Sequence, residues 1–140
     1  MLQHIEQIKF HTNGAKLYEI TDIVLKWIVK LNLCNGLLNI SLQHTSASLI
    51  IQENADPTVL KDLENFFLKL VPYNTNYLHS TEGIDDMPAH IISSLTNTNI
   101  TLSVINNKLN LGTWQGIFLF EHRTSRKVRL ITLHFVGEVG

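Results

Sequence analysis

The chain has 140 residues, of which 44% are hydrophobic and 16% are charged, and 11 basic residues against 12 acidic ones leave a net charge of −1. This balance argues against nucleic acid or an anionic membrane as a partner, and the only cysteine, Cys34, excludes an internal disulfide. No apolar run approaches the roughly 20 residues of a membrane span, and the first residues lack a signal-peptide pattern. We therefore expect one soluble, cytoplasmic domain over residues 1–140, and the low charged fraction favours an oligomer.

The first elements in chain order are a strand and a helix. Residues 5–12 are strand-like and are followed by an Asn-Gly pair, which is typical of a turn. Apolar residues then recur at i, i+3, i+4 and i+7, which predicts an amphipathic helix. Thr21 is its expected N-cap, and the helix is expected to end near Asn35 and Gly36.

Two strands and a second helix are expected next. Residues 37–44 alternate between apolar and polar, as in a half-buried strand, and residues 49–54 are a further strand candidate. Asp56 as N-cap and Pro57 at the first helical position start the second helix. Its inward residues are expected to be Leu60, Leu63, Phe67 and Leu70.

The second half of the sequence begins with a polar loop over 73–86, kinked at Gly83, and a short helix over 87–95. Either Asp85 or Asp86 can cap that helix. From residue 100 onward the pattern changes to strands separated by short turns. Together these elements predict a single α+β domain, largely an antiparallel sheet or sandwich, with two main helices and one short helix.

The strand over 111–123 ends in a polar triplet, Glu121, His122 and Arg123. Its middle is apolar on both faces, so we expect it to be covered on both sides. Alternation points Glu121 and Arg123 one way and His122 the other. Buried ionisable groups of this kind suit acid–base or anion-binding work, although a salt bridge at a strand end explains them equally well.

Four of the seven histidines lie beside other polar groups, namely His44, His79, His90 and His122. Each has a structural explanation: a satisfied group at a strand end, an exposed loop side chain, or a local pair such as Asp86 with His90 one helical turn later. The same histidines could also form a zinc site with Asp85, Asp86 or Glu121. Their spacing matches no local ligand motif, so both interpretations stay open.

Four sequence blocks, "HTSAS", "ENADP", "GIDDMPAH" and "GTWQGI", occur in one register between about Leu37 and Arg123. In these blocks the chain closely resembles the YjbQ-like family of secondary thiamine-phosphate synthase enzymes. The resemblance implies a small α+β homotrimer with a site near the subunit boundary. It also implies a transferase that joins a hydroxymethylpyrimidine diphosphate to a thiazole phosphate and releases diphosphate, as a secondary activity in thiamine biosynthesis.

Carried over residue by residue, the resemblance implies two groups of site residues. Those expected to take part in catalysis are His44, His79, Asp86, His90, Glu121 and His122. Those expected to bind phosphorylated small-molecule substrates are Thr45, Ser46, Glu82, Asp85, Trp114, Gln115 and Arg123. In this scheme Arg123 would hold phosphate oxygens, and Glu121 would orient an imidazole.

A second hypothesis is a metal-binding or phosphometabolite-binding protein, or a metal-dependent hydrolase, of unknown physiological substrate. The candidate metal ligands are His44, His79, Asp86 and His90. The expected cofactor is a divalent cation, magnesium or zinc, and no organic cofactor is expected.

Overall fold

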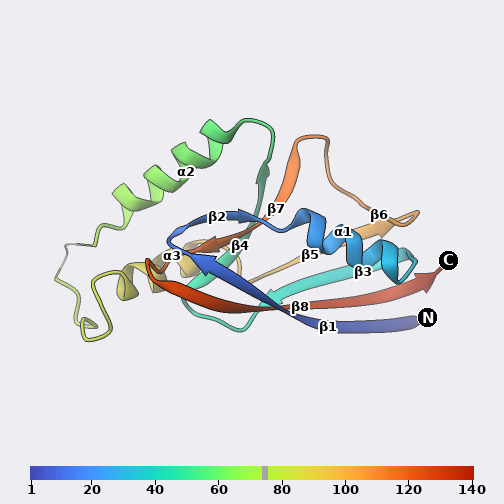
Figure 1. Ribbon diagram of the computed structural model, residues 1–140, viewed down its shortest axis with the longest axis horizontal. Coiled ribbons are helices and arrows are strands. Elements are labelled where there is room, and N and C mark those ends of the chain that lie inside the picture. Colours follow the sequence, from blue (N-terminus) through green and yellow to red (C-terminus); the bar gives the residue numbers. More distant parts are fainter. Residues whose placement is uncertain (74–75) are drawn as a thin grey trace.

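A computed structural model describes residues 1–73 and 76–140 of the chain. Within these ranges the protein is a single α+β domain of antiparallel strands and three helices, as the sequence predicts (Figure 1). The predicted loop over 73–86 includes Asn74 and Thr75, which lie outside the described residues. No helix in the described part of the chain is long and apolar enough to cross a membrane.

The strands form two sheets. The larger sheet has the order β1-β8-β3-β5-β6, with β1 at Leu2–Asn13, β8 at Arg126–Val139, β3 at Leu33–Leu42, β5 at Asn99–Ile105 and β6 at Lys108–Leu109. The smaller sheet has the order β2-β7-β4, with β2 at Lys16–Glu19, β7 at Gln115–Glu121 and β4 at Ala47–Glu53. The helices are α1 at Thr21–Lys30, α2 at Pro57–Leu70 and α3 at Asp86–Leu95.

The central strand β7 separates two hydrophobic cores. Ile117 and Leu119 face the main core, which the larger sheet and α1 complete. Phe118 and Phe120 face a second core, to which α2 and α3 contribute. The prediction that this strand is covered on both sides is confirmed, and its polar end therefore emerges from a buried strand.

Four local predictions are wrong. Within residues 1–73 and 76–140, no side-chain hydrogen bond caps α3, because the Asp85 side chain accepts from Arg123 and Thr124 instead. Helix α1 ends at Lys30, because Asn32 adopts a left-handed conformation (φ 52°) and the chain enters β3 at the buried Leu33. The Thr21 hydroxyl does not cap α1; it accepts from the Ile117 N–H at 2.9 Å and donates to Glu19. Leu70 is 53% exposed, because it lies one turn after the exposed Phe66 on the outer face of α2, whereas Phe67 and Val71 contact the second core.

The predicted starts of the other two helices agree better with the structure. Asp56 caps α2 by accepting from the Thr58 N–H at 2.9 Å, and Pro57 is its first residue. Helix α3 begins at Asp86, and the preceding Gly83 has φ 105°, which supports the predicted kink. The turn at Gly83 and the start of α3 together position Asp85 and Asp86.

Candidate functional site

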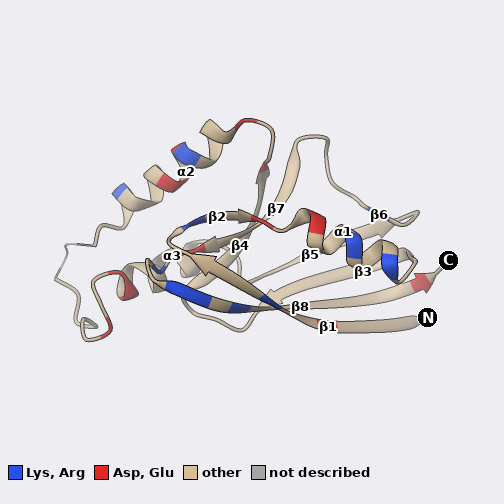
Figure 2. Cartoon of the chain, viewed as in Figure 1, with Lys and Arg blue, Asp and Glu red and all other residues tan. Residues whose placement is uncertain are grey.

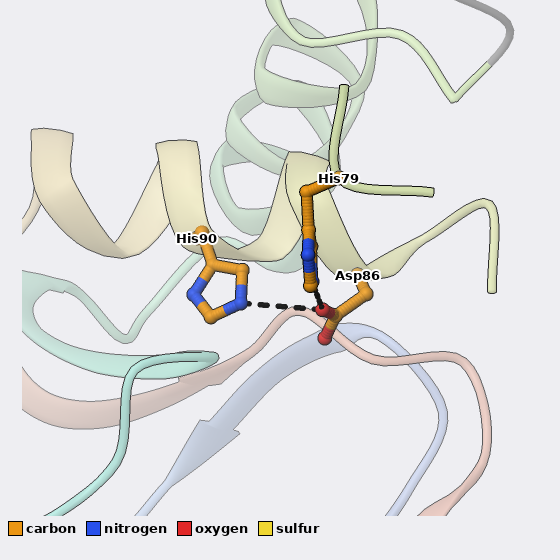
Figure 3. Close-up of side chains that lie close together, drawn as sticks. All are labelled: His79, Asp86 and His90. Carbon is orange, nitrogen blue, oxygen red and sulfur yellow. Dashed lines mark hydrogen bonds and ion pairs between the residues drawn. The ribbon is translucent and has the colours of Figure 1, made fainter. Parts of the chain in front are cut away.

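Two imidazoles and one carboxylate converge at the start of α3. His79 comes from the loop before the helix, Asp86 is the first helical residue, and His90 follows one turn later. Nε2 of His79 lies 2.7 Å and Nε2 of His90 lies 3.2 Å from the same Oδ2 of Asp86 (Figure 3). The three ligand atoms all lie within 4.8 Å of one another. The predicted pairing of Asp86 with His90 is confirmed, and the loop adds His79.

The cluster is buried on the carboxylate side and open on the imidazole side. Asp86 is 3% exposed, whereas the side chains of His79 and His90 are 42% and 34% exposed. Burial raises the pKa of Asp86, but the hydrogen bond from His79 and the positive charge of Arg123 outweigh this effect and leave the pKa below its usual value. The carboxylate is therefore ionised at neutral pH, and the two half-exposed imidazoles separate it from solvent.

Arg123 fixes the position of this carboxylate. Its Nη1 donates to Oδ1 of Asp86 at 2.6 Å, its Nε donates to Oδ2 of Asp85 at 3.0 Å, and its Nη2 donates to the Glu82 carbonyl at 2.9 Å. Asp85 also accepts from the N–H and the hydroxyl of Thr124. The expectation that Arg123 holds substrate phosphate therefore does not fit this arrangement, because each of its nitrogens already has a protein acceptor. Two carboxylates against one guanidinium leave a net negative charge beside the histidines.

Glu121 forms a separate buried centre. Its Oε1 accepts from the Thr12 hydroxyl at 2.6 Å and from Nε of Arg129 at 2.7 Å, and its Oε2 accepts from Nη2 of Arg129. Oε2 also accepts the backbone N–H groups of His122 and Arg123. Burial raises the pKa of Glu121, but the bonds from Arg129 and Thr12 outweigh it and lower the pKa. Both oxygens are engaged, so the predicted role of Glu121 in orienting an imidazole does not fit; Asp86 has that geometry instead.

His122 points away from Glu121, toward the second core, as strand alternation predicts. It is 2% exposed, its ring packs against Phe120 at a centroid distance of 4.4 Å, and its Nε2 lies 2.9 Å from the Ser48 hydroxyl. Burial lowers the pKa of His122 to about 3, with a smaller opposing effect from Glu121. The imidazole is therefore neutral at physiological pH and enclosed by protein.

His44 lies on a cleft of about 380 Å³ that it shares with His90. The other residues on this cleft all have hydroxyl groups: Thr45, Ser93, Ser94, Thr96 and Thr98. Nε2 of His44 accepts the Leu130 N–H at 2.9 Å, which holds the ring against β8. Among the described residues, the group that can hold an ion comprises His79, Asp86 and His90, so the expectation that His44 is a fourth metal ligand does not fit.

The comparisons with known proteins now identify the family. Residues 6–138 match the family model described as "UPF0047 protein YjbQ-like". The chain is 48% identical over 138 residues to a UPF0047 protein of Synechocystis, covering 98% of this chain and 94% of that protein. It is 49% identical over 120 residues to UPF0047 protein YjbQ of Escherichia coli O157:H7, covering 85% and 87%. The chain belongs to the UPF0047 family.

Solved structures share the fold of this UPF0047 protein. A conserved hypothetical protein from Thermus thermophilus superimposes with a TM-score of 0.82 at 30% identity, covering 94% of this chain and 99% of that one. A protein from Sulfolobus solfataricus, described as YbjQ-like and of unknown function, superimposes with a TM-score of 0.86 at 24% identity, covering 98% and 100%. At 24% identity, the similarity to the Sulfolobus solfataricus protein is evidence for the fold alone.

The resemblance to the YjbQ-like family is thus confirmed, whereas the activity inferred from it is wrong. The matching family is described only as UPF0047 and YjbQ-like, and the solved relative from Sulfolobus solfataricus is described as of unknown function. These findings support no thiamine-phosphate synthase, so neither the expected transferase activity nor the expected place in thiamine biosynthesis is supported for this UPF0047 protein.

Two predicted substrate-binding residues lie far from the other candidates. Trp114 precedes β7 and is 63% exposed, and the Gln115 side chain accepts the Gly112 N–H at 2.7 Å. Both lie at the opposite end of β7 from Glu121, and a strand of seven residues spans about 20 Å. In this UPF0047 chain the conspicuous "GTWQGI" block therefore forms a turn and a strand entry, outside the histidine cluster.

One buried residue missed by the sequence analysis is Arg129, which contacts Glu121. Arg129 lies on the inward face of β8 with Ile131 and Leu133, and is 5% exposed. A signal was present, because alternation in "VRLITLHFV" places an arginine among buried apolar residues. A buried guanidinium needs a carboxylate partner, and Glu121 of the UPF0047 chain meets that need.

Proposed function

We propose that this protein binds one divalent transition-metal ion through His79, Asp86 and His90. The observation that carries the proposal is the convergence of both Nε2 atoms on one oxygen of Asp86 (Figure 3). An ion placed between these atoms would replace the two N–H hydrogens that now point at the carboxylate. The half-exposed side chains of His79 and His90 would supply two nitrogen ligands, and Asp86 would supply an oxygen ligand.

The ligand set decides between the two expected cations. Two imidazoles with one carboxylate suit zinc, manganese, iron or cobalt, whereas magnesium prefers oxygen ligands and retains its water. Arg123 holds the second oxygen of Asp86 and so orients the carboxylate, which is the usual arrangement around protein-bound metals. The nearby charges of Asp85 and Asp86 exceed that of Arg123, which also favours a cation.

Three protein ligands leave coordination positions open for water and for a substrate. A metal-bound water has a pKa of about 7 in comparable sites, so it can act as a hydroxide nucleophile. His90, one of the three proposed ligands, also lines the hydroxyl-lined cleft, so a substrate in that cleft would lie beside the metal site. We therefore propose metal-dependent hydrolysis of a small anionic metabolite. Phosphorylated small-molecule substrates are expected from the sequence resemblance, so a phosphorylated metabolite is the proposed form.

Metal titration of chelator-treated protein tests this proposal. We expect about one Co²⁺ or Zn²⁺ per chain by calorimetry and by the visible absorption of Co²⁺. His90→Ala should weaken binding by at least about tenfold, because it removes one of three ligands. His11→Ala is the matched control, since His11 is an exposed histidine on β1 outside the cluster.

Equal metal affinity in the His90→Ala variant and in the wild type would contradict the site, as would the absence of binding. Assays of small phosphate and carboxylate esters with the Zn²⁺ and Mn²⁺ forms then test hydrolysis separately.

We also propose that the chain forms the homotrimer that the resemblance implies, with no nucleic-acid or membrane partner, in the cytoplasm. Support for self-association comes from α2, which projects at the edge of the molecule and has no buried residue (Figure 1). Phe66 and Leu70 lie one turn apart on this helix and are 57% and 53% exposed. Exposed apolar side chains at this spacing suit a protein interface.

Light scattering during gel filtration is expected to give three times the chain mass of 15.9 kDa. Phe66→Asp should shift the protein toward the monomer, because it places a charge within the apolar contact. Lys61→Asp, an exposed change on the same helix, should leave the mass unaltered. A wild-type mass equal to one chain would overturn the trimer.

A further inference from the structure

The guanidinium of Arg129 is only partly satisfied by the protein. Its Nε and Nη2 bond to Glu121, and Nη2 also bonds to the carbonyl and hydroxyl of Ser46 at 3.1 and 3.0 Å. Among the described residues, the remaining nitrogen, Nη1, has one hydrogen-bonding neighbour, Nδ1 of His44 at 3.5 Å. Arg129 belongs to the basic start of β8 with Arg126 and Lys127, and it is the buried member of that group (Figure 2).

The contact between Arg129 and His44 cannot be an ordinary hydrogen bond. Nε2 of His44 accepts the Leu130 N–H at 2.9 Å, so the lone pair of the neutral ring is on Nε2 and the proton is on Nδ1. Burial, together with the positive charge of Arg129, lowers the pKa of His44, so the ring is neutral at physiological pH. Nδ1–H and Nη1–H are therefore both donors, 3.5 Å apart, and neither can accept from the other.

Two donors that face one another without an acceptor form a binding position for an oxygen atom. We propose that His44 Nδ1–H and Arg129 Nη1–H bind one oxygen of an oxyanion, the phosphate or carboxylate group of the substrate. His44 lines the cleft that also contains His90, so this group would be held at one end of the cleft while the reacting group reaches the metal. The Thr45 hydroxyl on the same cleft adds a further donor.

The role of this anion site in holding a substrate rests on the proposed function, but binding of the anion does not require the metal. Glu121 neutralises the charge of Arg129, so directed donors, rather than net charge, would provide the affinity. The arrangement gives His44 a role as a ligand-binding residue, distinct from the metal-binding role expected from the sequence.

The first test is the protonation state of His44 in metal-free wild-type protein. Long-range ¹H–¹⁵N spectra of histidine should show a protonated Nδ1 and an unprotonated Nε2 for His44. Addition of millimolar inorganic phosphate should shift the Nδ1 signal of His44 and leave that of exposed His11 unchanged. A parallel titration with acetate shows whether carboxylate binds as phosphate does. A proton on Nε2, or no response of His44 to either anion, would overturn the inference.

The second test changes the guanidinium. Arg129→Lys keeps the charge beside Glu121 but removes Nη1, and should weaken phosphate binding by about tenfold or more in calorimetry. Arg126→Lys, an exposed change on the same strand, is the matched control. Unchanged phosphate affinity in folded Arg129→Lys would contradict the site.

The His90→Ala variant separates this inference from the proposed function. Phosphate binding that persists while metal binding is lost shows that the anion site is independent of the ion. Metal binding by wild-type protein whose His44 does not respond to anions would overturn the anion site alone.

Discussion

Replacing Glu121 with alanine is expected to lower the free energy of unfolding by about 3–5 kcal/mol, because it leaves a buried arginine without its carboxylate. Glu121 is fully buried and Arg129 is 5% exposed, so water can replace the lost partner only if the surrounding structure opens. The change also removes the acceptor of the Thr12 hydroxyl and of two backbone N–H groups. Urea denaturation followed by circular dichroism measures the loss.

A double replacement tests whether the unpaired charge is the cause. Glu121→Leu combined with Arg129→Met removes both charges and should recover much of the stability lost in Glu121→Ala, since buried ion pairs can be exchanged for apolar residues of similar size. Arg126→Met is the control for loss of an exposed arginine from the same strand. A loss below about 1 kcal/mol in Glu121→Ala would show that the pair stabilises the fold little.

The second large expected effect is a loss of folding stability at low pH, caused by the buried His122. Its pKa is about 3 in the folded protein against 6.5 for the unperturbed group, so the unfolded chain binds this proton first as the pH falls. The contribution of His122 to stability is therefore complete above pH 6.5 and is lost progressively between pH 6.5 and about 3. The slope from this one group approaches about 1.4 kcal/mol per pH unit within that window.

Comparison of His122→Gln with wild type isolates this contribution. Glutamine does not titrate, so the difference in unfolding free energy between the two proteins should shrink or reverse as the pH falls from 7 to 4. His11→Gln, at an exposed position, should retain the wild-type dependence on pH. Parallel pH profiles for wild type and His122→Gln would show that the buried ring contributes no such dependence.

Periodicity predicted the fold well where burial is one-sided or complete. The alternation of Leu38, Ile40 and Leu42 correctly indicated the inward face of β3, and the double apolar face of β7 correctly indicated two cores. The end of α1 was predicted too late, because a left-handed asparagine at position 32 ends the helix before the Asn35-Gly36 pair. The end of this helix depends on the backbone conformation of one residue, which cannot be inferred from the spacing of apolar residues.

The site was predicted in part for a similar reason. Asp86 and His90 lie four residues apart on a helix, so their contact follows from helix geometry, whereas His79 joins them through the path of a loop. The partner of Glu121 could not be chosen from sequence, because β7 and β8 lie in different sheets. Glu121, His122 and Arg123 are consecutive in sequence, but their side chains contact different parts of the protein.

That divergence restricts how this segment can change by insertion or deletion. Glu121 reaches β8, His122 reaches β4, and Arg123 reaches the start of α3. Adding or removing one residue here would exchange the directions of all three side chains, so each would meet a partner of the wrong chemistry. Substitutions can alter one of these contacts at a time, whereas a change in chain length disrupts the ion pair, the buried imidazole and the contact with the Asp86 carboxylate together.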